Sequence, residues 1–97
     1  MELLFVYGTL QDPEVQTRII GRTVSGTPDV LEDFFKSPIA MSDGVYPLVI
    51  PRHGAAVEGM VLEVTQEELA RMDVYETSAY RRVRVPLRSG REAWVYA

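Results

Sequence analysis

The pattern of apolar and polar positions predicts that the chain begins with a strand, a tight loop and a helix. Residues 3–7 form an apolar run of strand-favouring residues that stops at Gly8, typical of a buried strand entering a sharp turn. In the next segment Asp12 is a suitable N-cap, Pro13 suits the first helical position, and Gly21 can take the left-handed closing conformation. The inner face of this helix is expected to consist of Val15, Ile19 and Ile20.

The middle of the chain has a less regular pattern. Residues 23–43 are interrupted by glycine and proline, and we expect irregular strands there. Residues 46–51 contain two prolines, which indicates a sheet edge or a shaped loop. Residues 52–55 are expected to form a turn, and residues 57–64 a strand at the boundary of the core.

The last third of the chain predicts a second helix followed by a hairpin. Thr65 and Glu68 have the spacing of a capping box, which fixes where the helix begins. Residues 80–87 and 91–96 read as strands joined by a turn at residues 88–90. Five or six short strands and two helices predict a single α+β domain over residues 1–97, with a curled β-sheet or a small β-barrel.

Composition narrows the possible chemistry. The absence of cysteine excludes disulfides, thiolate zinc sites and a cysteine nucleophile, and the single histidine, His53, excludes a two-histidine metal site within one chain. Ten basic and fourteen acidic residues give a net charge of -4 with no basic cluster, so nucleic acid is not an expected partner. The apolar runs are too short for a bilayer and no secretory leader is visible, so we expect no membrane association and a cytoplasmic location.

Two segments carry candidate chemistry. Leu69, Met72 and Glu76 follow one face of the second predicted helix, so a carboxylate shares its apolar stripe. Burial and the negative end of the helix dipole both raise the pKa of such a carboxyl, which suits a general acid or base. At the end of the first strand, the loop over residues 7–10 would leave successive backbone N–H groups free to bind a carboxylate or phosphate.

Each of these features also has a structural interpretation. The helix could end near Tyr75, so that Glu76 turns to solvent or pairs with Arg81 or Arg82. Gly8 could be needed only because a tight turn requires dihedral angles that glycine adopts easily, without any binding site in the loop. The local pattern alone does not decide between these alternatives.

The ordered set of short motifs resembles the gamma-glutamylcyclotransferase-like superfamily. Its closest resemblance is to the short branch with gamma-glutamylamine cyclotransferase and the plant avirulence-induced-gene-like proteins, and it covers essentially the whole chain. The motifs that carry it are Phe5-Val6-Tyr7-Gly8-Thr9-Leu10, Tyr46-Pro47 with Pro51, Val57-Glu58-Gly59, Met72-Asp73-Val74-Tyr75-Glu76, Tyr80-Arg81-Arg82 and Ala93-Trp94-Val95-Tyr96.

This resemblance implies a mixed, barrel-like sheet with a cavity at its mouth. It implies that the α-amine of a γ-glutamyl group attacks its own γ-carbonyl, which forms 5-oxoproline and releases an amine, without a cofactor or metal. Glu76 would be the general acid/base. The residues expected to bind the small-molecule γ-glutamyl substrate are Tyr7, Gly8, Thr9, Leu10, Gln11, Tyr46 and Tyr80.

Two further expectations concern the role and the extent of this chain. A noncatalytic small-molecule binding or interaction module using the same cavity is the alternative to an enzyme. The sequence ends at Ala97, so a C-terminal segment that closes the cavity in longer relatives is expected to have no counterpart in these residues. Of the remaining side chains, His53 is expected in solvent and Trp94 in the core, and at most one of Arg81 and Arg82 can face the cavity.

Overall fold

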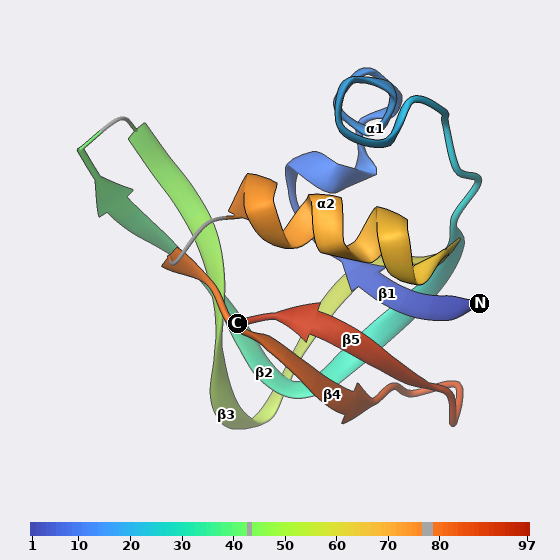
Figure 1. The fold of residues 1–97 in the computed structure, drawn as a ribbon. Helices are drawn as coiled ribbons and strands as arrows, with labels where there is room; N and C mark the ends of the chain where they lie inside the picture. Colours follow the sequence, from blue (N-terminus) through green and yellow to red (C-terminus); the bar gives the residue numbers. More distant parts are fainter. Residues whose placement is uncertain (43, 77–78) are drawn as a thin grey trace.

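The structure is a computed structural model that describes residues 1–42, 44–76 and 79–97. In these residues it has five strands, two α-helices and one short 3-10 helix (Figure 1). In chain order the elements are β1 (Glu2–Val6), η1 (Thr9–Gln11), α1 (Pro13–Ile20), β2 (Thr27–Met41), β3 (Gly44–Val64), α2 (Gln66–Glu76), β4 (Arg82–Pro86) and β5 (Glu92–Tyr96).

The strands form one mixed sheet in the order β2-β3-β1-β5-β4. β1 is parallel to β5, and the other neighbouring pairs are antiparallel. The sheet curls so that the β4–β5 turn reaches β2, where Arg88 N–H donates to the Val30 carbonyl at 2.9 Å and Ser89 Oγ lies 2.5 Å from Asp29 Oδ2. The predicted α+β fold with a mixed, curled sheet is therefore confirmed, in the form of a half-barrel.

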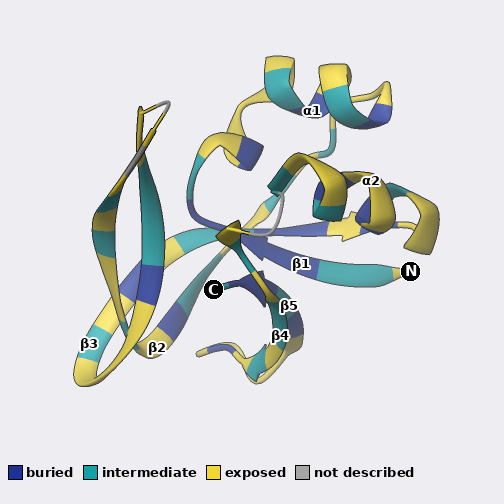
Figure 2. Ribbon diagram, turned by 60° about the vertical axis from the view of Figure 1, so that its left-hand side comes forward, coloured by how far each residue is buried: buried dark blue, intermediate teal, exposed yellow. Residues whose placement is uncertain are grey.

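β1 is buried on both faces, which explains its continuous apolar run. Its alternate residues point to opposite sides of the sheet, so Leu4 and Val6 join one apolar cluster and Phe5 and Tyr7 join another. The first cluster lies under α1 and α2 and includes Leu69 and other side chains of the helices. The second consists mainly of residues from β1, β2, β3 and β5, where Figure 2 shows buried stretches along the curved sheet. The C-terminal end of β1 therefore lies between the two clusters.

Both predicted helices are present, and their first residues are fixed as the sequence indicates. Asp12 Oδ1 accepts a hydrogen bond from Glu14 N–H at 2.9 Å, and Gly21 has φ 78°, which closes α1. Thr65 and Glu68 exchange hydrogen bonds of 3.0 and 3.1 Å, so the capping box is confirmed. No helix within the described ranges combines the length and the apolar character needed to span a bilayer.

The turn expected at residues 52–55 is wrong. β3 is continuous through this segment, and the pairing of β2 with β3 shifts register between Glu32 and Phe34. At this bulge Asp33 has φ 64° and Gly54 has φ 83°, and Asp33 Oδ1 accepts a hydrogen bond from Gly54 N–H at 3.0 Å. The glycine therefore bends the long strand pair without ending either strand.

Beyond the bulge, β2 and β3 continue as a two-stranded ribbon. Residues 44–51 pair with β2, whereas β1 pairs only with residues 60–64 of β3. Pro38 faces Pro47 in this ribbon, and both prolines are tolerated because the ribbon has free edges. The expected edge position of residues 46–51 is confirmed, while residues 27–41 form one strand rather than several irregular ones. The ribbon extends away from the body of the sheet (Figure 1).

Candidate active site

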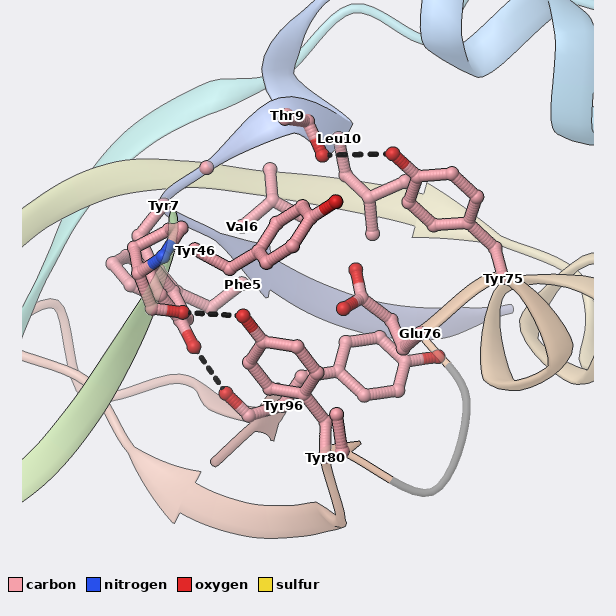
Figure 3. A pocket seen from close by; sticks show the side chains of 13 residues that line it. Phe5, Val6, Tyr7, Thr9, Leu10, Tyr46, Tyr75, Glu76, Tyr80 and Tyr96 are labelled. Carbon is pink, nitrogen blue, oxygen red and sulfur yellow. Dashed lines mark hydrogen bonds between the residues drawn. The ribbon is translucent and has the colours of Figure 1, made fainter. Parts of the chain in front are cut away.

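A cavity of about 290 Å³ lies where the C-terminal ends of β1 and α2 meet Tyr46 and Pro47 of the ribbon. Its wall is largely aromatic, and Figure 3 shows how the side chains converge on it. The lining residues are Phe5, Val6, Tyr7, Gly8, Thr9, Leu10, Tyr46, Pro47, Tyr75, Glu76, Ala79, Tyr80 and Tyr96.

One wall of the cavity is the loop that leaves β1. Gly8 is the N-cap of η1, and the N–H groups of Gln11 and Asp12 donate to the carbonyls of Gly8 and Thr9 at 3.0 Å each. The first N–H groups of a helical turn have no acceptor within it, which leaves Thr9 and Leu10 with donors that the turn does not use. A Cβ at Gly8 would lie 3.1 Å from Cγ of Pro47, so glycine allows the ribbon to approach the loop.

The loop is held from behind by Gln16 of α1. Its Nε2 donates to the Leu10 carbonyl at 2.8 Å, and its Oε1 accepts from Val24 N–H at 2.8 Å. Gln16 is 2% exposed, which makes it the buried polar side chain of the described core. Both ends of the amide are therefore satisfied by backbone groups, and the position of Leu10 is fixed by a bond that water does not reach.

Glu76 enters the cavity from the opposite side. It is the last residue of α2 and follows the buried side chains of Leu69 and Met72 on the same helix face. Its carboxylate is half-buried, points into the cavity (Figure 3) and has no hydrogen bond or ion pair with the described part of the chain. Burial raises the pKa of Glu76 from its ordinary 4.5 to about 7.

The alternative position for Glu76 is excluded by this geometry. α2 includes Glu76 instead of ending before it, and the carboxylate does not turn to solvent. Arg82 forms its ion pair with Asp73, at 3.2 Å between Nη2 and Oδ2, and it also stacks on the Trp94 ring. None of the described arginine or lysine side chains forms an ion pair with Glu76. A carboxyl whose pKa burial raises to about 7 is suited to act as a general acid or base.

Three phenols in the wall are fixed by hydrogen bonds. Tyr80 donates to the Pro47 carbonyl at 2.5 Å, and Tyr7 donates to the Tyr96 carbonyl at 2.5 Å. The Tyr96 hydroxyl in turn donates to Asp73 Oδ1 at 2.7 Å. Burial raises the pKa of all three phenols, so they stay protonated at neutral pH. Each phenol donates its one O–H to the protein, so these three hydroxyls fix the wall of the cavity and supply no base.

Tyr75 connects the two sides of the site. Its hydroxyl lies 3.1 Å from Thr9 Oγ1, so the residue before Glu76 is bonded to the loop that follows β1 (Figure 3). Tyr75 is 36% exposed and lies on the solvent side of the cavity. The loop and the end of α2 are thereby held at one spacing around the cavity mouth.

The structure brings most of the predicted site residues to one place. Those that line the cavity are Tyr7, Gly8, Thr9, Leu10, Tyr46, Glu76 and Tyr80. Gln11 is not in the lining, because its amide closes the η1 turn and its Nε2 lies 3.4 Å from the Gly8 carbonyl. Arg81 and Arg82 also lie outside the lining, and the His53 side chain is fully exposed as expected.

The sequence reasoning missed several residues of the site, among them Tyr75, Ala79, Tyr96 and Gln16. Tyr75 and Ala79 flank Glu76 in sequence, which was the available signal for them. Tyr96 is 89 positions from Tyr7, and nothing in its strand pattern shows that it reaches the same cavity. Gln16 lies in α1 without any local sign that its side chain is buried.

The fold and the site define a class of protein that a family comparison also finds. The family described as gamma-glutamyl cyclotransferase, AIG2-like, matches residues 4–97, and the chain belongs to this family. Among its relatives, AIG2-like protein C from Arabidopsis thaliana is 36% identical over 80 residues, covering 81% of this chain and 45% of that protein. AIG2-like protein A from the same plant is 35% identical over 83 residues, covering 84% and 49%. This chain spans about half the length of both.

Solved structures share the fold along the whole chain. A solution structure of an Arabidopsis thaliana protein has a TM-score of 0.84 at 27% identity, covering 99% of this chain and 61% of that one. A gamma-glutamyl cyclotransferase has a TM-score of 0.71 at 19% identity, covering 98% and 64%. At that identity the second likeness concerns the fold alone.

Proposed function

We propose that the protein converts a γ-glutamyl amine or γ-glutamyl amino acid to 5-oxoproline and the free amine, with Glu76 as general acid/base. The single observation that carries the proposal is the half-buried Glu76 carboxylate, which has no partner in the described chain and shares a cavity with the loop after β1. Membership of the gamma-glutamyl cyclotransferase, AIG2-like family supports the same class of activity.

The reaction begins with the α-ammonium group of the substrate. Glu76 takes one proton from it, and the free amine attacks the γ-carbonyl carbon of the same glutamyl group. A carbon–nitrogen bond forms, a five-membered ring closes, and the carbonyl oxygen becomes an oxyanion. Because a pKa of about 7 lies near the working pH, Glu76 can both accept this proton and return one.

Collapse of the tetrahedral intermediate completes the reaction. The bond between the former carbonyl carbon and the leaving nitrogen breaks, and protonated Glu76 donates a proton to that nitrogen. The ring nitrogen loses its second proton to solvent, so the products are 5-oxoproline and an amine without any water being added. The N–H groups of Thr9 and Leu10 are donors for the oxyanion and the α-carboxylate.

An intramolecular attack suits a cavity of this kind. A ring closure needs the amine held against the carbonyl more than it needs a strong nucleophile, and such orientation can contribute about 7–11 kcal/mol in well-held cases. A cavity of about 290 Å³ with an aromatic wall can hold a small γ-glutamyl compound in one conformation. The bonds of Gln16 and Tyr75 keep the loop in place for this purpose.

The test is to incubate the protein with a panel of γ-glutamyl compounds, including γ-glutamyl-ε-lysine, and to measure 5-oxoproline. We expect turnover of at least one member, and a loss of at least about 100-fold in Glu76→Gln because general acid/base catalysis contributes about this much. Glu58→Gln is the matched control, because Glu58 is an exposed carboxylate of β3 outside the cavity. Turnover that survives Glu76→Gln refutes the role of Glu76.

The same panel distinguishes an enzyme from a binding module. A noncatalytic module would bind a γ-glutamyl compound and show a higher melting temperature without consuming it, because a ligand of the native state stabilises that state. Absence of turnover on every member, together with such a shift in melting temperature, would replace the enzyme by the binding module.

A further inference from the structure

A second hollow adjoins the cavity, on the face of the ribbon that is turned toward the loop after β1. Its lining residues are Lys36, Pro38, Val45, Tyr46 and Pro47, and two of these, Tyr46 and Pro47, also line the cavity that contains Glu76. The two spaces are therefore neighbours, separated by Tyr46 and Pro47.

The register of the ribbon fixes the direction of Lys36. Lys36 lies opposite Val49, and Pro38 lies opposite Pro47, so these residues share one face of the ribbon. Val49 is buried in the same apolar cluster as Tyr7, which shows that this face turns toward the loop. The Lys36 ammonium accordingly lies 3.4 Å from the Tyr7 carbonyl.

The sequence contains one lysine, Lys36. Among the described residues that line the two spaces, Lys36 is the one with a cationic side chain and Glu76 is the one with an anionic side chain. An ammonium group has three donors, and the Tyr7 carbonyl uses one of them. No carboxylate within the described ranges pairs with Lys36, so its remaining donors are available to a ligand.

We propose that Lys36 binds a carboxylate on the leaving group of the substrate, so that the protein prefers γ-glutamyl amino acids to γ-glutamyl amines that lack this carboxylate. This inference rests on the proposed function. In the binding mode we propose, the loop holds the glutamyl group with its γ-carbonyl beside Tyr7 and Gly8, near the Lys36 ammonium. In a γ-glutamyl amino acid the second carboxylate is three bonds from that carbonyl carbon, within about 4 Å of it.

The opposite charges of the two spaces match the two ends of such a substrate. The α-ammonium of the glutamyl group is directed to Glu76, and the carboxylate of the released amino acid is directed to Lys36. A γ-glutamyl amine without the carboxylate would leave Lys36 with no partner beyond the Tyr7 carbonyl. The preference therefore comes from one ion pair at the edge of the site.

The test compares γ-glutamyl-alanine with γ-glutamyl-ethylamide, which have the same glutamyl group and differ in the carboxylate of the leaving group. We expect Lys36→Met to lower the ratio of their kcat/KM values roughly two- to fivefold, the range of an exposed ion pair. Lys36→Arg should retain most of the ratio. Arg52→Met is the matched control, because Arg52 stacks on Phe35 at 4.5 Å, on the other face of the ribbon.

An unchanged ratio in Lys36→Met would overturn the inference, and so would an equal loss for both compounds, since Lys36 would then act on the shared glutamyl group. If neither compound is turned over, the proposed function fails, and calorimetric dissociation constants for the same compounds and variants decide the role of Lys36. Tighter binding of γ-glutamyl-alanine that is lost in Lys36→Met supports the carboxylate site. Equal binding of the two compounds, or no binding, overturns it.

Discussion

The hydroxyl groups of Thr9 and Tyr75, 66 positions apart in sequence, lie 3.1 Å from each other at the mouth of the cavity. This contact joins the loop after β1 to the last turn of α2, directly before Glu76. The donors of the loop and the carboxylate of the helix are therefore held at a fixed separation, although no strand pairing connects them.

Breaking this contact should affect activity more than stability. For Tyr75→Phe we expect kcat to fall roughly three- to tenfold, because small displacements of an acid/base group are costly. The free energy of unfolding should change by less than about 1 kcal/mol, because the bond is exposed. Thr9→Val removes the same bond, so steady-state kinetics of the double variant should show no further loss. If the losses in kcat of the two single variants multiply in the double variant, Thr9 and Tyr75 do not act through their shared hydrogen bond.

Replacing the carboxyl of Glu76 should make stability less dependent on pH. Its pKa is raised from 4.5 to about 7, so the folded protein binds an extra proton between these values and becomes less stable as pH rises through them. Because the group is partly exposed, we expect a loss of about 2 kcal/mol by pH 8. Because part of this loss has already occurred at pH 5.5, urea unfolding at pH 5.5 and pH 8 should show Glu76→Gln gaining on the wild type by about 1 kcal/mol. An equal difference at both pH values would contradict the raised pKa.

Adding a methyl group at Gly8 should narrow the cavity. A Cβ there would lie 3.1 Å from Cγ of Pro47, so the ribbon must move away from the loop. We expect Gly8→Ala to lower kcat/KM about tenfold, measured by 5-oxoproline formation. Gly21→Ala is the control, because Gly21 has φ 78° and open space around it. It should cost about 1 kcal/mol of stability at constant kcat/KM.

Removing the buried amide of Gln16 should destabilise the fold. Gln16→Met keeps the length of the side chain but leaves the Leu10 carbonyl and Val24 N–H without their partner. We expect a loss of about 2–4 kcal/mol in chemical unfolding, since each buried unsatisfied group costs about 1–3 kcal/mol. Gln11→Met should change stability by less than about 0.5 kcal/mol, because that side chain is exposed and its bond to Gly8 is long. An equal loss of stability in Gln16→Met and Gln11→Met would contradict the role given to the two buried hydrogen bonds of Gln16.

Local signals in the sequence predicted the elements that depend on local chemistry. Asp12, Gly21 and the Thr65–Glu68 box fix helix ends within a few residues of themselves, and each has the predicted role. The apolar run of β1 predicted burial because both of its faces are covered. The bulge at Asp33 and Gly54 could not be predicted, since a glycine between two strand-like runs also suits a turn.

Which residues line the cavity depends on pairing between strands that are far apart in the sequence, so local patterns could not predict all of them. Tyr96 reaches Tyr7 because β1 is parallel to β5, and a parallel neighbour from the far end of the chain leaves no local pattern. Gln11 was expected in the site because it follows the loop, but the η1 turn uses its amide. Lys36 reaches the loop because the β2–β3 ribbon, which continues beyond the bulge, passes beside Tyr7.

The most direct test of the central claim is the pH dependence of kcat/KM for 5-oxoproline formation, measured for the wild type and Glu76→Gln from pH 5 to 9. If Glu76 accepts the proton, the wild-type profile rises with an apparent pKa of about 7. Glu76→Gln should then be at least about 100-fold slower and lack this rise. A Glu76→Gln variant with the rate and profile of the wild type would contradict the account.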